Sequence, residues 1–176
     1  MQEAIQSPPK TILEVYQMLP EGTRAELING ILYMSPAPTT DHQETSITLS
    51  SRIFHFVTKK KLGKVYASPI DVYLNENNSF QPDIVFISKE NNSIVKKSGI
   101  HGCPDLVVEI LSPSTKKFDL VKKKNVYETS GVKEYWIVDP ETKECTGFQL
   151  KKGKFEDLKK EKGKIVSSLL KTSFKF

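Results

Sequence analysis

The order of the predicted elements indicates an α/β protein in which a mixed β-sheet is flanked by helices. A short helix and a hairpin come first, a longer helix follows, and several apolar, β-branched segments surround one later helix. Helices interspersed with strands are typical of a sheet with helical cover. The length fits a single domain over residues 1–176, with a core over about residues 11–150 and a lysine-rich extension over residues 151–176.

The first elements are expected to be a short helix and a β-hairpin. Residues 11–19 form the helix, which a proline and a Glu-Gly turn bring to an end. Residues 25–34 form the hairpin about Asn29-Gly30, because Asn-Gly between two apolar runs favours a tight two-residue turn.

A longer helix is predicted over residues 41–61, after a break at two prolines, with Gly63 as its C-cap. The apolar residues spaced to bury one stripe of this helix are Ile47, Leu49, Ile53, Phe54 and Val57. Burial of this stripe would place the helix against one face of the sheet.

Strands are expected after this helix wherever short apolar runs lie between Pro, Asn and Gly clusters. Their predicted ranges are residues 64–67, 70–74, 83–88, 105–111, 134–138 and 144–150. A helix over residues 116–130, which Gly131 ends, separates the fourth and fifth of them. The C-terminal extension is expected to add one or two short edge strands.

Composition places the protein among ordinary globular chains and gives little support for nucleic-acid binding through bulk charge. The net charge is +5, but residues 151–176 hold nine lysines and three acids, so the remaining chain has a net charge of −1. Neither a membrane-spanning segment nor a signal peptide is evident, so we expect a cytoplasmic protein with no membrane partner. Cys103 and Cys145 lack the spacing of a zinc site, and we expect both to be reduced.

Glu109 is the most informative single residue. It lies in the run Leu106–Leu111, whose other members are all apolar, as in a strand buried on both faces. A buried carboxylate is normally paired, bound to a metal or protonated, because burial of an unpaired charge is costly. The alternative to a functional role is a structural ion pair.

Asp83 gives Glu109 a candidate partner. It follows Pro82 at the start of the apolar strand over residues 84–87, a position where an aspartate alone would indicate only a turn. If the two acids lie on neighbouring strands, their oxygens could hold a hard divalent cation. The pair therefore predicts a metal site.

The helix after Glu109 supplies the third element. Asp119, Lys123 and Tyr127 recur at a spacing of four and share one face, whereas Lys122 and Lys124 point elsewhere. A lysine beside a metal site can orient the attacking water or stabilise the charge that develops on a phosphodiester. Without the two acids, a solvated lysine run would be the better interpretation.

The chain resembles the Uma-two family of restriction endonucleases, within the PD-(D/E)XK nuclease superfamily. The resemblance runs from about Leu13 to Phe174 and is most specific over residues 103–140. Its segments are Glu26 in AELINGILYMSPAP, Pro82-Asp83, CPDLVVEILSPST, Asp119-Leu120 with Lys123 and Tyr127, and GVKEYWIVDP.

The resemblance implies a restriction-endonuclease-like fold, with Asp83 and Glu109 as ligands of Mg²⁺ or Mn²⁺ and Lys123 as the catalytic lysine. The superfamily expects a lysine two residues after the second acid, but that position is Leu111 here, so the helix residue Lys123 takes its place. The resemblance also marks Glu26 and His42. Glu26 is either another metal ligand or a polar residue on the outer face of the hairpin. His42 has a structural role, caps its helix or contacts a DNA phosphate.

The resulting hypothesis is an endonuclease that hydrolyses DNA phosphodiester bonds by metal-activated water, with magnesium or manganese as its cofactor. The lysines expected to bind DNA are Lys116, Lys117, Lys122 and Lys124. Asp71 either lines the same cleft or makes a structural hydrogen bond. The alternatives are a catalytically silent nuclease fold that binds nucleic acid or another partner, and a hydrolase of small phosphoesters. A homodimer would suit the cutting of both strands.

Overall fold

The computed structural model describes residues 8–112 and 118–176, with the side chains of residues 118–120 excepted. It is built on two large β-sheets and a third sheet of two strands. The seven-stranded sheet is mixed, with the order β12-β11-β10-β9-β6-β3 and β13 beside β11. Its strands are β3 (Gly63–Ala67), β6 (Ile84–Ser88), β9 (Leu106–Ile110), β10 (Glu134–Val138), β11 (Glu144–Lys151), β12 (Lys154–Asp157) and β13 (Glu161–Lys162). The mixed α/β fold class predicted from the sequence is confirmed.

The second sheet has six strands in the order β2-β1-β5-β4-β8-β7. These are β1 (Ala25–Ile28), β2 (Ile31–Met34), β4 (Val72–Asn75), β5 (Asn78–Phe80), β7 (Val95–Lys96) and β8 (Gly99–His101). The sequence predicted a single sheet, and this expectation was wrong because β5, β7 and β8 are too short to carry a clear strand pattern. The hairpin about Asn29-Gly30 is observed, and it forms one edge of this sheet.

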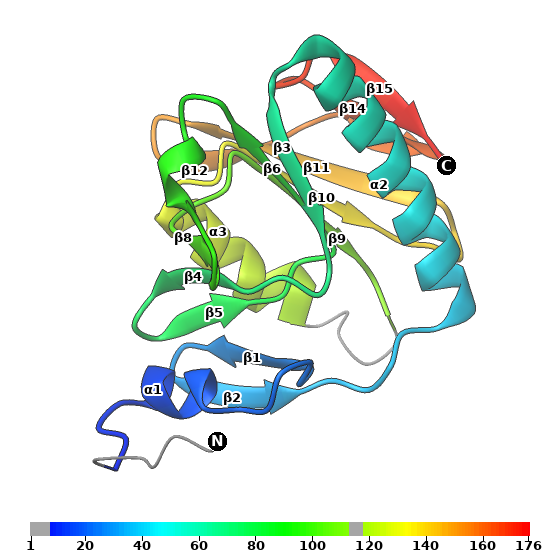
Figure 1. The fold of residues 1–176 in the computed structure, drawn as a ribbon. Coiled ribbons are helices and arrows are strands. Elements are labelled where there is room, and N and C mark those ends of the chain that lie inside the picture. Colours follow the sequence, from blue (N-terminus) through cyan, green and yellow to red (C-terminus); the bar gives the residue numbers. More distant parts are fainter. Residues whose placement is uncertain (1–7, 113–117) are drawn as a thin grey trace.

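Helices cover both faces of the seven-stranded sheet (Figure 1). The helices are α1 (Ile12–Gln17), α2 (Thr40–Lys60), a short 3₁₀ turn (Asn92–Ile94), a π-helical turn (Phe118–Lys123) and α3 (Lys124–Ser130). Along β6 and β9, even-numbered side chains pack against α2 and odd-numbered side chains pack toward α3 and the second sheet. This alternation follows from the two-residue period of a strand. Glu109 therefore belongs to the α3 side, whereas Asp83 lies just before β6, where His42 of α2 contacts it.

The predicted stripe on α2 needs correction. Its buried residues are His42, Thr45, Leu49, Ile53 and Val57, whereas Ile47 and Phe54 are 70% and 56% exposed. The buried set follows a spacing of three and four residues, and two polar residues extend it toward the N-terminus of the helix. The C-cap is Lys61 in the left-handed conformation, and Gly63 instead begins β3.

The C-terminal extension contains more strands than the one or two expected. Residues 151–176 hold β12 and β13, and also the hairpin of β14 (Lys164–Ser167) and β15 (Thr172–Lys175). Ile165 and Phe174 of this hairpin pack into the same core as α2. Among the described residues, no helix is long and apolar enough to cross a membrane.

Gly147 is required by the packing of the only tryptophan. It lies opposite Trp136 across β10 and β11, and a Cβ added there would lie 2.6 Å from the indole ring. Gly147→Ala should therefore lower the free energy of unfolding by about 1–3 kcal/mol through overpacking. Urea denaturation checks this, with Glu144→Ala on the exposed end of the same strand as control. Equal stabilities of the two variants would contradict the packing argument.

Candidate active site

Asp83 and Glu109 come together because β6 and β9 are antiparallel neighbours. Ile84 pairs with Val108, so one further step along the ladder sets Asp83 opposite Glu109. Side chains directly opposite each other share a face of the sheet. Both acids are buried, with 8% and 3% of their surfaces exposed. The structure thus brings together the two acids that the sequence singled out.

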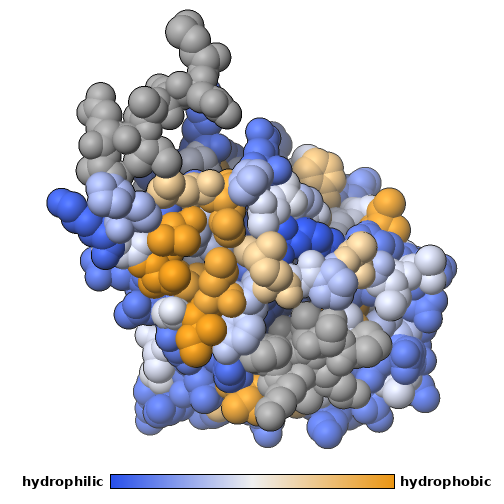
Figure 2. Space-filling view, turned by 90° about the horizontal axis from the view of Figure 1, so that it is seen from below, coloured by the Kyte–Doolittle hydropathy of each residue, from blue (hydrophilic) through white to orange (hydrophobic). Residues whose placement is uncertain are grey.

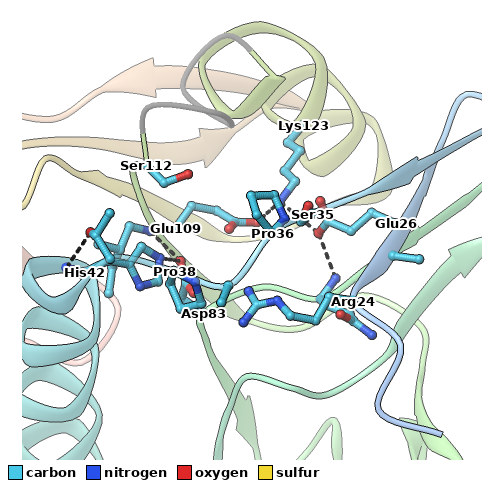
Figure 3. Close-up of a pocket in the computed structure, with 15 residues that line it drawn as sticks. Arg24, Glu26, Ser35, Pro36, Pro38, His42, Asp83, Glu109, Ser112 and Lys123 are labelled. Atoms are coloured by element: carbon cyan, nitrogen blue, oxygen red, sulfur yellow. Dashed lines mark hydrogen bonds and ion pairs between the residues drawn. The ribbon is translucent and has the colours of Figure 1, made fainter.

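The two acids line a pocket of about 250 Å³ (Figure 3). The segment between β2 and α2 forms part of its wall. Within the described part of the chain, the charged and histidine side chains lining it are Arg24, Glu26, His42, Asp83, Glu109 and Lys123. With His42 counted as neutral, three carboxylates and two cations give the lining a formal charge of −1.

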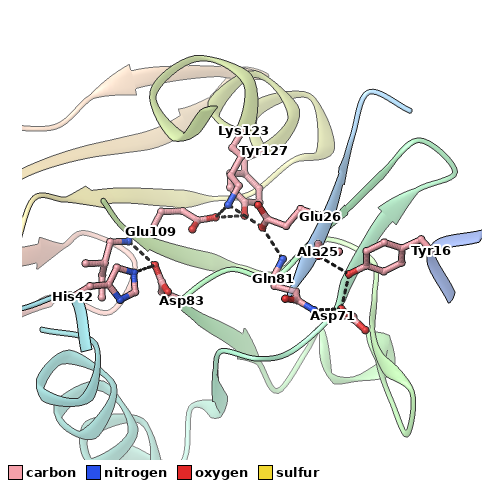
Figure 4. A network of polar contacts seen from close by, with 11 residues as sticks. Tyr16, Ala25, Glu26, His42, Asp71, Gln81, Asp83, Glu109, Lys123 and Tyr127 are labelled. Carbon is pink, nitrogen blue, oxygen red and sulfur yellow. Dashed lines mark hydrogen bonds and ion pairs between the residues drawn. The ribbon is translucent and has the colours of Figure 1, made fainter. Parts of the chain in front are cut away.

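Lys123 enters this pocket from the π-helical turn that precedes α3. Its Nζ lies 2.9 Å from Glu26 Oε1 and 3.1 Å from Glu109 Oε1, and the residue is 3% exposed (Figure 4). Lys122 and Lys124 are more exposed than Lys123, as predicted. π-Helical turns are frequent at functional sites. The interpretation as a wholly solvated lysine run is therefore wrong for Lys123.

Tyr127 lies one turn further along the helix and also contacts Glu109. Its hydroxyl donates to Glu109 Oε1 at 2.7 Å. Burial, reinforced by the negative charge of Glu109, raises the pKa of the Tyr127 hydroxyl well above its ordinary value. The hydroxyl therefore stays protonated and acts as a donor. The remaining predicted member of this face, the Asp119 side chain, lies outside the described residues.

Glu26 faces the pocket, so the alternative that placed it on the outer face of the hairpin was wrong. Besides the contact with Lys123, its Oε1 accepts a hydrogen bond from the backbone N–H of Gln81 at 2.8 Å. The carboxylate is thus held from two sides. The hairpin contributes to the pocket because the second sheet packs against the α3 side of the first.

Asp83 is held by His42 and by the backbone. The backbone N–H of Ile110 donates to Asp83 Oδ2 at 2.7 Å, and His42 Nε2 lies 3.2 Å from the same oxygen. His42 occupies the first turn of α2, where Thr39 is the N-cap and accepts from the His42 N–H. The side chain of His42 therefore orients Asp83 and does not cap the helix. Within the described residues, its buried Nδ1 has no hydrogen-bond partner.

Asp71 lies outside this pocket and makes structural hydrogen bonds. Its carboxylate accepts from the Tyr16 hydroxyl at 2.6 Å and from Gln81 Nε2 at 3.0 Å. Burial and the bond to Asp71 raise the pKa of Tyr16. Gln81 connects the two clusters, because its side chain bonds to Asp71 and its backbone bonds to Glu26 (Figure 4).

Two of the lysines expected to surround the site, Lys122 and Lys124, are among the described residues, and neither lines the pocket. Lys122 Nζ donates to the Tyr33 hydroxyl at 3.0 Å, and Lys124 Nζ lies 3.8 Å from the centre of the Phe148 ring. Lys116 and Lys117 lie outside the described residues. Arg24 also lines the pocket and was not predicted from the sequence, although its position two residues before Glu26 on an extended segment is a signal that both face the same side.

The fold and this site define a mixed α/β protein with a pocket of buried carboxylates. The fold is similar to that in the crystal structure of a putative nuclease belonging to DUF820 from Anabaena variabilis ATCC 29413. The TM-score is 0.70, the identity is 19%, and the match covers 85% of this chain and 84% of that chain. At this identity the likeness concerns the fold alone.

The family follows from the sequence match. The model of the Uma2 family, described as putative restriction endonuclease, matches residues 12–173, so the chain belongs to this family. The resemblance noted from the sequence motifs is thereby confirmed. No curated protein matches the chain.

The donor set of the pocket fits a small, hard divalent cation. Asp83 and Glu109 supply carboxylates, and within the described residues Asp83 Oδ1 accepts no hydrogen bond. No group of three or more His, Cys, Asp or Glu residues is arranged to enclose a metal in the described part of the chain. Two carboxylates suffice for Mg²⁺, which usually keeps several waters and shares substrate phosphates. The formal charge of the pocket also favours a cation.

The Tyr127 hydroxyl should stabilise the fold in a pH-dependent way. Tyr127→Phe leaves a buried acceptor on Glu109 with one donor fewer, which should cost about 1–3 kcal/mol of unfolding free energy near neutral pH. Because the folded pKa is raised, this contribution is fully present below the unfolded pKa of about 10 and is lost as the pH rises above it.

Urea denaturation of both proteins between pH 7 and pH 11 checks this expectation. The stability difference between wild type and Tyr127→Phe should be constant up to about pH 10 and then shrink. Tyr66→Phe, on β3 outside the pocket, is the control. A difference that persists unchanged to pH 11 would contradict the assignment.

Proposed function

We propose that this protein is a metal-dependent DNA endonuclease that hydrolyses phosphodiester bonds in the pocket of Asp83, Glu109 and Lys123. The observation that carries the proposal is the meeting of two buried carboxylates from adjacent strands with one buried lysine. Membership of the restriction endonuclease family supports a nucleic-acid substrate. The choice of DNA and of hydrolysis is our inference.

In this proposal, Asp83 and Glu109 would hold Mg²⁺ or Mn²⁺, which when bound stabilises the negative charge that develops on the phosphate. His42 and the Ile110 N–H keep Asp83 in place. Glu26 keeps Lys123 in place, and Tyr127 keeps Glu109 in place.

Lys123 provides a buried cation in contact with Glu109. A buried ammonium group can orient the attacking water through a hydrogen bond, and it can stabilise charge in the transition state without prior reorganisation. The contacts to Glu26 and Glu109 hold its Nζ in one place. Pre-organisation of this kind is the contribution that we assign to the chain itself.

A catalytically silent member of the nuclease fold is the second candidate, and one observation favours it. The three carboxylates of the pocket already accept hydrogen bonds or ion pairs from groups of the chain itself. A metal or a substrate would have to compete with these contacts. Measurements of metal binding and of cleavage separate the two candidates.

The first test is metal binding by calorimetry. Glu109→Gln should abolish the binding of Mg²⁺ or Mn²⁺, which we expect in the micromolar to millimolar range, because the amide supplies no charge. Glu134→Gln is the matched control, since Glu134 is buried on the neighbouring strand β10 and bonds to Trp136 outside the pocket. Unchanged affinity in Glu109→Gln would contradict the metal site.

The second test is cleavage of DNA. Activity should require a divalent metal and should weaken steeply with salt, because phosphate contacts release counterions. Lys123→Ala should reduce the single-turnover rate by about 100-fold or more, the scale found when a pre-organised donor to the transition state is removed.

Lys122→Ala is the control for this test, because Lys122 is the sequence neighbour that bonds to Tyr33 instead of lining the pocket. Its rate should stay within about threefold of wild type, as for a residue that contributes mainly to binding. Equal losses in the two variants, or full cleavage in chelator, would overturn the mechanism. Folding of both variants is verified by circular dichroism.

A further inference from the structure

We propose that Arg24 is a phosphate-binding residue of this pocket and contacts the nucleic-acid backbone beside the reacting carboxylates. This inference rests on the proposed function for the identity of the ligand. It concerns a residue to which neither the motifs nor the carboxylate pair assigned a role.

The first support is the position of Arg24 in the fold. It immediately precedes β1, and its backbone C=O accepts a hydrogen bond from the Ser35 N–H at 3.0 Å, which holds it in register with the hairpin. Two residues further on, Glu26 faces the pocket, so the strand alternation directs both side chains to the same side. In Figure 3 the Arg24 side chain runs across the pocket toward the side of Asp83.

The second support is the state of its guanidinium group. Within the described residues, Arg24 has no ion-pair partner, and its Nε is buried without a hydrogen-bond acceptor. Buried donors of this kind are rare and call for an explanation. Lys123, the other cation of the pocket, is already shared between two carboxylates. Arg24 is thus the cation available to a negatively charged ligand in the described lining.

The third support is the choice of residue. Of the 26 basic residues, only Arg24 and Arg52 are arginines. Arg differs from Lys in its planar fork of donors, which matches two oxygens of a phosphate at once. A phosphodiester carries one negative charge. One divalent cation would balance the charge of the phosphodiester and the charge of −1 on the pocket lining. A phosphate is therefore the ligand that fits both the fork of donors and the charge.

Arg52 supplies a matched control, because it is exposed on α2 and does not line the pocket. Binding of a fluorescent DNA duplex is measured by anisotropy in Ca²⁺ over a range of salt concentrations. Arg24→Ala should weaken binding by about 10-fold or more and reduce the salt slope by about one. Arg24→Lys should keep the slope yet recover only part of the affinity, and Arg52→Ala should match wild type.

A second readout uses the wild-type protein. With two arginines, the ¹⁵N spectrum of the Nε–Hε groups contains two arginine signals, which the two alanine variants assign. Addition of inorganic phosphate or of a dinucleotide should shift the Arg24 signal and leave the Arg52 signal in place.

The outcomes separate this inference from the proposed function. If DNA is neither bound nor cut but phosphate shifts the Arg24 signal, the nuclease assignment fails and the phosphate site stands. If DNA is cut and Arg24→Ala behaves like Arg52→Ala in affinity and salt slope, the inference about Arg24 is overturned. An Arg24 signal that responds to neither phosphate nor dinucleotide also overturns it.

Discussion

The arrangement of the molecule depends on two ion pairs. They join the ammonium group of Lys123 to the carboxylates of Glu26 and Glu109. Burial of a charge is tolerated only where its partners are in place, and removal of one partner of a buried pair typically costs about 3–5 kcal/mol. Glu26 comes from the six-stranded sheet, Glu109 from the seven-stranded sheet and Lys123 from the turn before α3. This three-way ion pair therefore ties both sheets and a helix together at one point.

The same requirement explains why the pocket lies where it does. The buried carboxylates line a pocket between the sheets, and His42 and Arg24 line it with them. Each carboxylate is oriented by a group from a different element, such as His42 from α2 for Asp83. Pre-organisation of this kind suits catalysis, because the chain need not rearrange during the reaction.

The sequence predicted the parts of the site that depend on local pattern. Glu109 stood out because its neighbours are apolar, and Lys123 because four-residue spacing placed it with Tyr127. The hairpin and the long helix were likewise predicted, since Asn-Gly and apolar periodicity act over a few residues.

Features that depend on tertiary packing could not be predicted. The direction of Glu26 is set by the packing of the second sheet on the first, and three strands of that sheet have only two or three residues. Phe54 is exposed because the buried stripe of α2 runs through Leu49, Ile53 and Val57. Asp71 alternates with apolar residues just as a cleft residue would, yet Tyr16 from a distant helix binds it.

The central claim is that Asp83 and Glu109 together bind a divalent metal ion. The most direct measurement is anomalous X-ray diffraction from crystals of the protein soaked in Mn²⁺. The account predicts a peak at coordination distance from an oxygen of each carboxylate. The account would be contradicted if no anomalous peak lay at these two residues while Lys123 remained bonded to Glu109 and Mn²⁺ was bound elsewhere on the protein.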